Sequence, residues 1–124
     1  MSERFFIVVV DDDPSVCKAL RRLLRAAHMD VETYPSSQSF LLAIDGRRPD
    51  CLVLDVRMPG LTGPELRDRL LELGYRFPVV FITAHAEELA FEAAVVGRVA
   101  EVLRKPFRDE ALLAAIGRAV QSPQ

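Results

Sequence analysis

Two unbroken apolar runs, each followed by acidic residues, constrain the fold of this chain more than any other feature. Phe5–Val10 and Cys51–Leu54 contain no polar residue apart from the thiol of Cys51. A strand with one solvated face alternates apolar and polar residues, so a run without alternation predicts a strand buried on both faces. Such strands are typical of parallel sheets covered by helices. The first run leads into Asp11–Asp13 and the second into Asp55, with the turn residues Pro59-Gly60 shortly after it.

Apolar residues at helical spacing separate the strand-like segments. We expect further strands over Val31–Tyr34, Pro78–Thr83 and Val99–Leu103. We expect helices from Pro14 to about His28, from Ser36 to near Gly46, from Pro64 to Gly74, from Ala86 to Val96, and from Asp109 onward. Strand and helix alternating five times predict a single α/β domain over residues 1–124, with a parallel sheet between helices.

Five strands and five helices fit the flavodoxin-like, doubly wound arrangement with strand order 2-1-3-4-5. In this order the chain reverses direction across the sheet between the first and third strands, and ligands bind at the carboxyl ends of those strands. The first strand ends at Asp11 and Asp12, and the third ends at Asp55. The topology therefore predicts a ligand site among these carboxylates.

Composition argues against several classes of function. The net charge is −2 and the isoelectric point is near 5.7, which disfavours nucleic acid as a direct ligand. No apolar run approaches the roughly 20 residues that cross a bilayer, and the N-terminus enters a strand pattern without a leader-like segment. Cys17 and Cys51 lie among apolar neighbours, which is typical of buried thiols in a reducing compartment. We therefore expect a cytoplasmic protein without a membrane partner.

Polar residues follow four of the expected strands: Asp11 and Asp12, Asp55, Thr83 and Lys105. The carboxyl ends of parallel strands share one edge of the sheet, so these side chains should converge. Two carboxylates about 4 Å apart repel by about 4 kcal/mol at an effective dielectric constant of 20. Three of them call for a counter-ion, and Mg²⁺ suits a site with one or two carboxylate ligands completed by water and carbonyl oxygens.

The remaining groups at this edge suit phosphoryl transfer. The Thr83 hydroxyl can donate to a tetrahedral oxyanion, and the Lys105 ammonium is a movable point charge. A carboxylate can act as a nucleophile and form an aspartyl-phosphate. Each residue also has a simpler interpretation, since Asp12 can cap a helix, Thr83 can merely end a strand, and Lys105 can be an ordinary surface residue. Their joint occurrence at four strand ends favours in-line phosphoryl transfer onto an aspartate.

The segments VVVDDDP, LVLDVRMPGLTG, VVFITAH and LRKPF, in this order, resemble the receiver domain of two-component response regulators. The resemblance covers nearly the whole chain and is strongest to the FixJ-type branch, whose full-length members usually carry a helix-turn-helix output domain. It implies that Asp55 accepts a phosphoryl group from a sensor histidine kinase and that the signal passes to an output domain or downstream protein. A homodimer formed on phosphorylation is also implied as a possibility.

The resemblance further implies two sets of ligands. The metal set comprises Asp12, Asp55 and the backbone carbonyl of Arg57, with Asp11 acting through a water molecule. The phosphoryl set comprises Thr83, the Ala84 backbone N–H and Lys105. It also implies a cis bond between Lys105 and Pro106. A receiver is expected not to be an enzyme in the usual sense, but to phosphorylate itself with Mg²⁺ and to lose the phosphoryl group slowly.

Two alternatives and two departures from the family pattern accompany this interpretation. The spacing of Asp11 and Asp13 matches the D-x-D of haloacid-dehalogenase-like phosphatases, in which Asp11 would be the nucleophile. A receiver fold that binds partners without accepting phosphate is the second alternative. The first departure is Val102, which occupies a position where the family usually has Tyr or Phe. The second is Gly97–Val99, which lies one residue out of step with the family pattern. We expect an altered switch or partner surface there.

Overall fold

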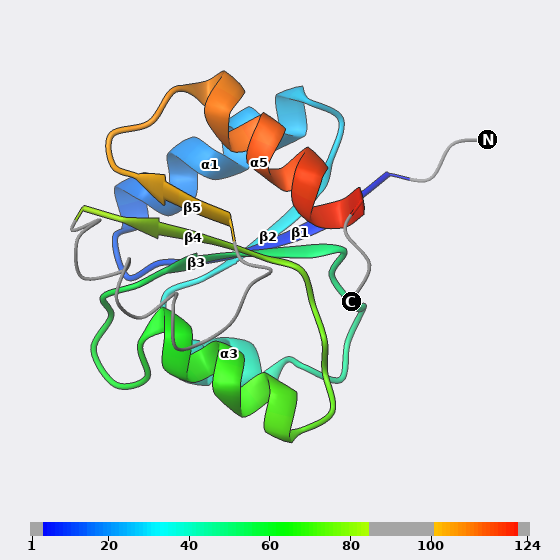
Figure 1. Ribbon diagram of the computed structural model, residues 1–124, viewed down its shortest axis with the longest axis vertical. Helices are drawn as coiled ribbons and strands as arrows, with labels where there is room; N and C mark the ends of the chain where they lie inside the picture. Colours follow the sequence, from blue (N-terminus) through cyan, green and yellow to red (C-terminus); the bar gives the residue numbers. More distant parts are fainter. Residues whose placement is uncertain (1–3, 85–100, 122–124) are drawn as a thin grey trace.

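The sheet has the predicted architecture. The computed structural model describes residues 4–84 and 101–121. Five strands form one sheet in the order β2-β1-β3-β4-β5, and every neighbouring pair is parallel (Figure 1). The strands are β1 (Phe6–Val10), β2 (Asp30–Tyr34), β3 (Cys51–Asp55), β4 (Val79–Thr83) and β5 (Glu101–Arg104). The doubly wound order 2-1-3-4-5 is thereby confirmed.

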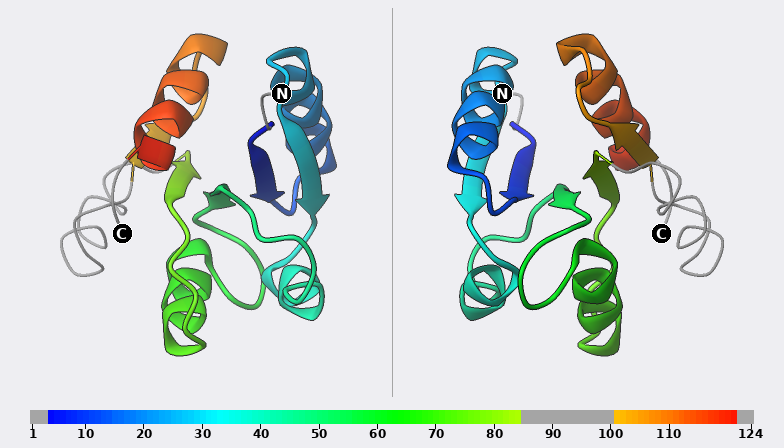
Figure 2. Two further views of the ribbon diagram at one scale, coloured as in Figure 1. Left: turned by 90° about the vertical axis from the view of Figure 1, so that its right-hand side faces the viewer. Right: turned by 90° about the vertical axis from the view of Figure 1, so that its left-hand side faces the viewer.

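Helices cover both faces of the sheet. Those described are α1 (Pro14–Ala26), α2 (Ser37–Leu42), α3 (Gly63–Glu72) and α5 (Asp109–Gln121). Figures 1 and 2 show α1 and α5 on one face and α2 and α3 on the other. The expected helix over Ala86–Val96 lies outside the described residues. Within the described ranges, no helix has the length and apolar character that crossing a membrane requires.

The unbroken apolar runs are explained by the two-sided core. On β1, Phe6, Val8 and Val10 pack into the cluster that contains residues of α2 and α3. The intervening Ile7 and Val9 pack into the opposite cluster, with residues of α1 and α5. All five residues are at most 3 % exposed. Each face of the strand therefore needs apolar side chains, which removes the alternation that a half-exposed strand would show.

Local sequence signals set the helix starts. The Asp13 carboxylate accepts a hydrogen bond from the Ser15 N–H at 2.8 Å, and Pro14 occupies the first helical position of α1. Before α3, Thr62 and Glu65 form the expected capping box, each side chain accepting from the other's backbone N–H. These contacts satisfy backbone donors that a helix N-terminus leaves unpaired.

Several expected boundaries were wrong by a few residues. Phe5 lies outside β1 and is 48 % exposed. Helix α2 ends at Leu42 rather than near Gly46, because the residues after it form tighter turns, such as Ile44 N–H to Leu41 O. Strand β5 ends at Arg104 rather than at Leu103, and Arg104 pairs with Thr83. The segment Gly97–Val99, including the expected start of this strand, lies outside the described residues. Val102 lies on β5 and is 38 % exposed.

Candidate functional site

Three carboxylates meet at the carboxyl edge of the sheet. Val10 of β1 is aligned with Leu54 of β3, so the residues that follow them, Asp11 and Asp55, lie side by side. One oxygen from each of Asp11, Asp12 and Asp55 lies within 4.8 Å of the others. Asp11 is 1 % and Asp55 6 % exposed, whereas Asp12 is exposed to solvent. This arrangement of oxygen ligands, open on one side, fits a hard divalent cation.

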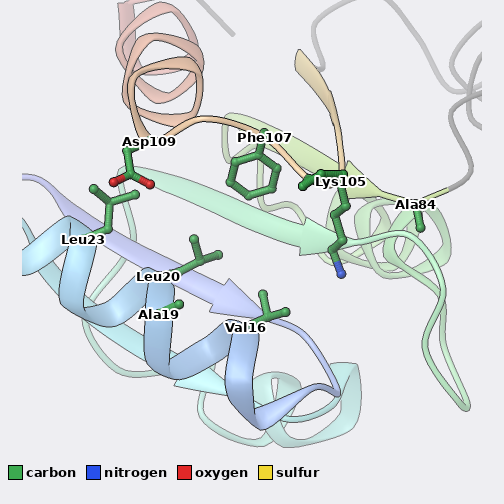
Figure 3. Close-up of a pocket in the computed structure, with 9 residues that line it drawn as sticks. Val16, Ala19, Leu20, Leu23, Ala84, Lys105, Phe107 and Asp109 are labelled. Atoms are coloured by element: carbon green, nitrogen blue, oxygen red, sulfur yellow. The ribbon is translucent and has the colours of Figure 1, made fainter.

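Lys105 lies against the acidic cluster. Its Nζ is 3.1 Å from Asp11 Oδ2 and 3.6 Å from Asp55 Oδ1. Its backbone N–H donates to the Thr83 carbonyl at 2.7 Å, which ties the end of β5 to the end of β4. The Lys105–Pro106 peptide bond is cis, as expected. Figure 3 shows the side chain leaving the end of β5 and reaching past the end of β3.

The electrostatics of Asp55 reflect crowding by negative charge. Burial, the Asp11 carboxylate and the Asp12 carboxylate raise its pKa from 3.8 to about 6, against the opposing effects of Lys105 and the Arg57 backbone N–H. Desolvation lowers the pKa of Lys105, but the Asp11 and Asp55 carboxylates outweigh it and the net shift is upward. Lys105 therefore stays charged and only partly neutralises the cluster. A divalent cation would complete the charge balance.

Thr83 and Ala84 complete the edge on the β4 side. Asp55 of β3 is aligned with Ile82 of β4, the last pair between these two strands, and Thr83 is the next residue of β4. Thr83 is 1 % exposed, and Ala84 directly after it is exposed. Arg57, the other predicted ligand residue, is exposed and follows Asp55 by two positions. The strand order thus brings the predicted side chains from β1, β3, β4 and β5 to one edge.

Comparison with known proteins identifies the family. The family model "Response regulator receiver domain" matches residues 7–117, most of the chain.

The chain belongs to the response regulator receiver family.

Similar proteins carry names of the same kind. The receiver is 39 % identical to the response regulator protein TodT of Pseudomonas putida over 127 residues, covering 100 % of this chain and 56 % of the relative. It is 38 % identical over 125 residues to the transcriptional regulatory protein FixJ of Bradyrhizobium diazoefficiens, covering 100 % of this chain and 60 % of that protein. The receiver therefore spans a little over half the length of these relatives.

Solved structures agree with this assignment. Full-length FixJ from B. japonicum superposes with a TM-score of 0.86 at 39 % identity, covering 97 % of this chain and 59 % of that chain. The crystal structure of FixJ-N superposes with a TM-score of 0.87 at 32 % identity, covering 99 % of this chain and 98 % of that chain. This family is a signalling domain rather than an enzyme in the usual sense.

An apolar groove lies beside the acidic cluster of the receiver. It has a volume of about 580 Å³ and runs between α1 and the segment that follows β5 (Figure 3). Its lining comprises Val16, Ala19, Leu20, Leu23, Ala84, Lys105, Pro106, Phe107 and Asp109. None of the three clustered carboxylates contributes to this lining. Lys105 is the residue that this groove shares with the site at the strand ends.

Gly63 supports the acceptor strand and was not singled out from the sequence. A Cβ added to Gly63 would lie 2.5 Å from the Asp55 carbonyl oxygen, so only glycine allows this approach of α3 to β3. Its N–H donates to the Val56 carbonyl at 3.1 Å. Glycine weakens a helix, so its place in the first turn of α3 was a signal that another constraint applies there.

Proposed function

We propose that this receiver accepts a phosphoryl group on Asp55 from a sensor histidine kinase, in a reaction that needs Mg²⁺, and transmits it as a conformational signal. The observation that carries the proposal is the convergence of three carboxylates and the Lys105 ammonium at one sheet edge. The names of TodT and FixJ, a response regulator and a transcriptional regulator, support an output in transcription.

The metal would be held by the acidic cluster. Asp12, Asp55 and the backbone carbonyl of Arg57 are the direct ligands in this proposal, and Asp11 acts through a water molecule. Oxygen ligands of this kind, with room for water, are those that Mg²⁺ prefers. When bound, Mg²⁺ would offset the negative charge of the phosphoryl oxygens and of the three carboxylates.

The residues of the chain itself supply the nucleophile and the groups that bind the phosphoryl oxygens. An Asp55 carboxylate oxygen forms the new P–O bond as the P–N bond to the donor histidine breaks, and the donor imidazole keeps that electron pair and takes up a proton. Thr83 Oγ, the Ala84 N–H and the Lys105 ammonium hold the phosphoryl oxygens. Slow attack by water on the aspartyl-phosphate returns the free carboxylate and releases phosphate, which resets the signal.

The wider role is part of the same proposal. Residues 1–124 act as one receiver domain, and an output domain or downstream protein receives the signal, with a homodimer possible on phosphorylation. This domain makes no direct contact with nucleic acid. A cytoplasmic location suits the role and is supported by two unpaired, buried cysteines, Cys17 and Cys51, which are typical of a reducing compartment.

Phosphoryl uptake from acetyl phosphate, with and without Mg²⁺, tests the proposal. The parent chain should become phosphorylated only with Mg²⁺, and Asp55→Asn should take up none. Asp45→Asn is the matched control, because Asp45 is exposed and belongs to no part of the acidic cluster, and it should behave as the parent. A parent chain that takes up no phosphate under any condition would favour the alternative of a receiver that signals by binding alone.

A further inference from the structure

The loop between β3 and α3 carries one proposed metal ligand on its backbone. It is closed at its base, where the Gly63 N–H donates to the Val56 carbonyl at 3.1 Å. Met58 within the loop is 7 % exposed and packs into the core. The Arg57 carbonyl has no side-chain torsion that could adjust its position. Its direction therefore depends on how the loop from Arg57 to Thr62 is held.

Helix α2 holds this loop from the side. Ser37 is 0 % exposed, and its hydroxyl donates to the Leu61 carbonyl at 2.9 Å, a contact between residues 24 positions apart. The next residue, Gln38, lies over Gly60, where an added Cβ would be 2.4 Å from Gln38 Nε2. Gly60 also has a positive φ of 79°. Two consecutive residues of α2 thus contact two consecutive residues of the loop.

We propose that Ser37 is a positioning residue for the metal site. Its hydroxyl holds the Leu61 carbonyl, and through the closed loop it sets the position of the Arg57 carbonyl, the metal ligand that the proposed function assigns to this loop. The inference rests on the proposed function, because it assigns a purpose to the Mg²⁺ site. Contacts outside the ligand shell commonly set ligand orientation, and losing one weakens metal binding by about 10- to 100-fold.

Calorimetric titration of Mg²⁺ into the metal-free parent, Ser37→Ala and Ser39→Ala tests this role. Ser39 is the matched control, because it lies in the same helical turn but its side chain bonds only to Ser36 in the contacts described. We expect the Mg²⁺ dissociation constant to rise about tenfold in Ser37→Ala and to stay at the parent value in Ser39→Ala. Melting temperatures without Mg²⁺ report the structural cost of each change separately.

The outcomes separate the two proposals. Equal dissociation constants in the parent and Ser37→Ala, or a parent that binds no Mg²⁺, would overturn the role of Ser37. Because calorimetry needs no phosphoryl donor, a parent that binds Mg²⁺ but takes up no phosphate would contradict the proposed function alone. If Ser37→Ala does not fold, Gly60→Ala disturbs the same loop from within and should weaken Mg²⁺ binding with Ser37 intact; unchanged binding would then count against the idea.

Discussion

At the end of β3, Asp55 lies close to the carboxylates of Asp11 and Asp12 and 3.6 Å from the ammonium of Lys105, and its pKa is raised to about 6. Burial is the largest cause, followed by the Asp11 carboxylate. A carboxyl with a raised pKa binds its proton more tightly in the folded state than in the unfolded state. The contribution of Asp55 to the stability of the metal-free protein therefore falls as pH rises from the unfolded value of 3.8 to about 6, and this loss is complete above that window.

Asp55→Asn should therefore stabilise the metal-free protein at pH 7. The neutral amide avoids the buried negative charge, so the free energy of unfolding should rise by about 1–3 kcal/mol. Denaturant unfolding of the parent and of Asp55→Asn, in the presence of a chelator, measures this free energy. The stability difference between Asp55→Asn and the parent should shrink as pH falls toward 4, where Asp55 itself is protonated. At pH 7, Mg²⁺ should also reduce this difference, because it stabilises the parent. A difference that does not change with pH would contradict the assignment.

Gly63→Ala tests the close approach of α3 to Asp55. The added methyl group would meet the Asp55 carbonyl oxygen at 2.5 Å, so we expect a loss of about 1–3 kcal/mol in the free energy of unfolding. Phosphoryl uptake should fall as well, because the acceptor's backbone must shift. Gly117→Ala is the control, since its Cβ meets nothing within 4 Å in α5 and should stabilise by about 0.5–1 kcal/mol. The same sign for both substitutions would refute this explanation.

At the scale of the element, helices α1 and α3 are both followed by a residue in the left-handed conformation, but the residue types differ. His28 follows α1 with a φ of 64°, and its N–H donates to the Arg25 carbonyl at 3.0 Å. Gly74 follows α3 with a φ of 91°, in open space. A left-handed residue ends a helix well, but only glycine adopts this conformation without a steric penalty.

Exchanging these residue types should move stability in opposite directions. His28→Gly should raise the free energy of unfolding by up to about 1 kcal/mol, and Gly74→Ala should lower it by about 1 kcal/mol, because a Cβ is penalised at positive φ. Neither position touches the acidic cluster, so Mg²⁺ dependence should not change. Urea unfolding of both variants measures these two changes in the free energy of unfolding. A loss of stability in His28→Gly would mean that the imidazole makes a compensating contact.

The elements that were predicted correctly are those set by local chemistry. Asp13-Pro14 and the Thr62–Glu65 capping box depend on neighbouring backbone donors and can be recognised without the fold. The contact of Ser37 with Leu61 has no comparable signal, because a serine in the first turn of a helix is ordinary and its partner is 24 residues away. The early end of α2 was also missed, since Ile44 continues the apolar spacing beyond the helix.

At the scale of the whole molecule, the sheet order follows from the alternation of strands and helices, and the place of the acidic cluster follows from the order. The clustering of Asp11, Asp12 and Asp55 was predictable because β1 and β3 are neighbours. The closeness of Lys105 to Asp11 was predictable only in outline. Lys105 comes from β5, which is separated from β1 by two strands, so its reach depends on the chain path after β5. The sequence pattern therefore predicts the order of the strands better than it predicts the position of a side chain such as that of Lys105.

The central claim is that carboxylates from β1 and β3 hold a divalent cation so that Asp55 can accept phosphorus. Locating the modified residue tests it most directly: the parent chain is treated with acetyl phosphate, reduced with borohydride to trap aspartyl-phosphate, and mapped by mass spectrometry, with Mg²⁺ and with chelator. We predict modification at Asp55 with Mg²⁺ and none with chelator. Modification at Asp11, as a D-x-D phosphatase would require, or labelling of Asp55 that is equal with and without metal, would contradict it.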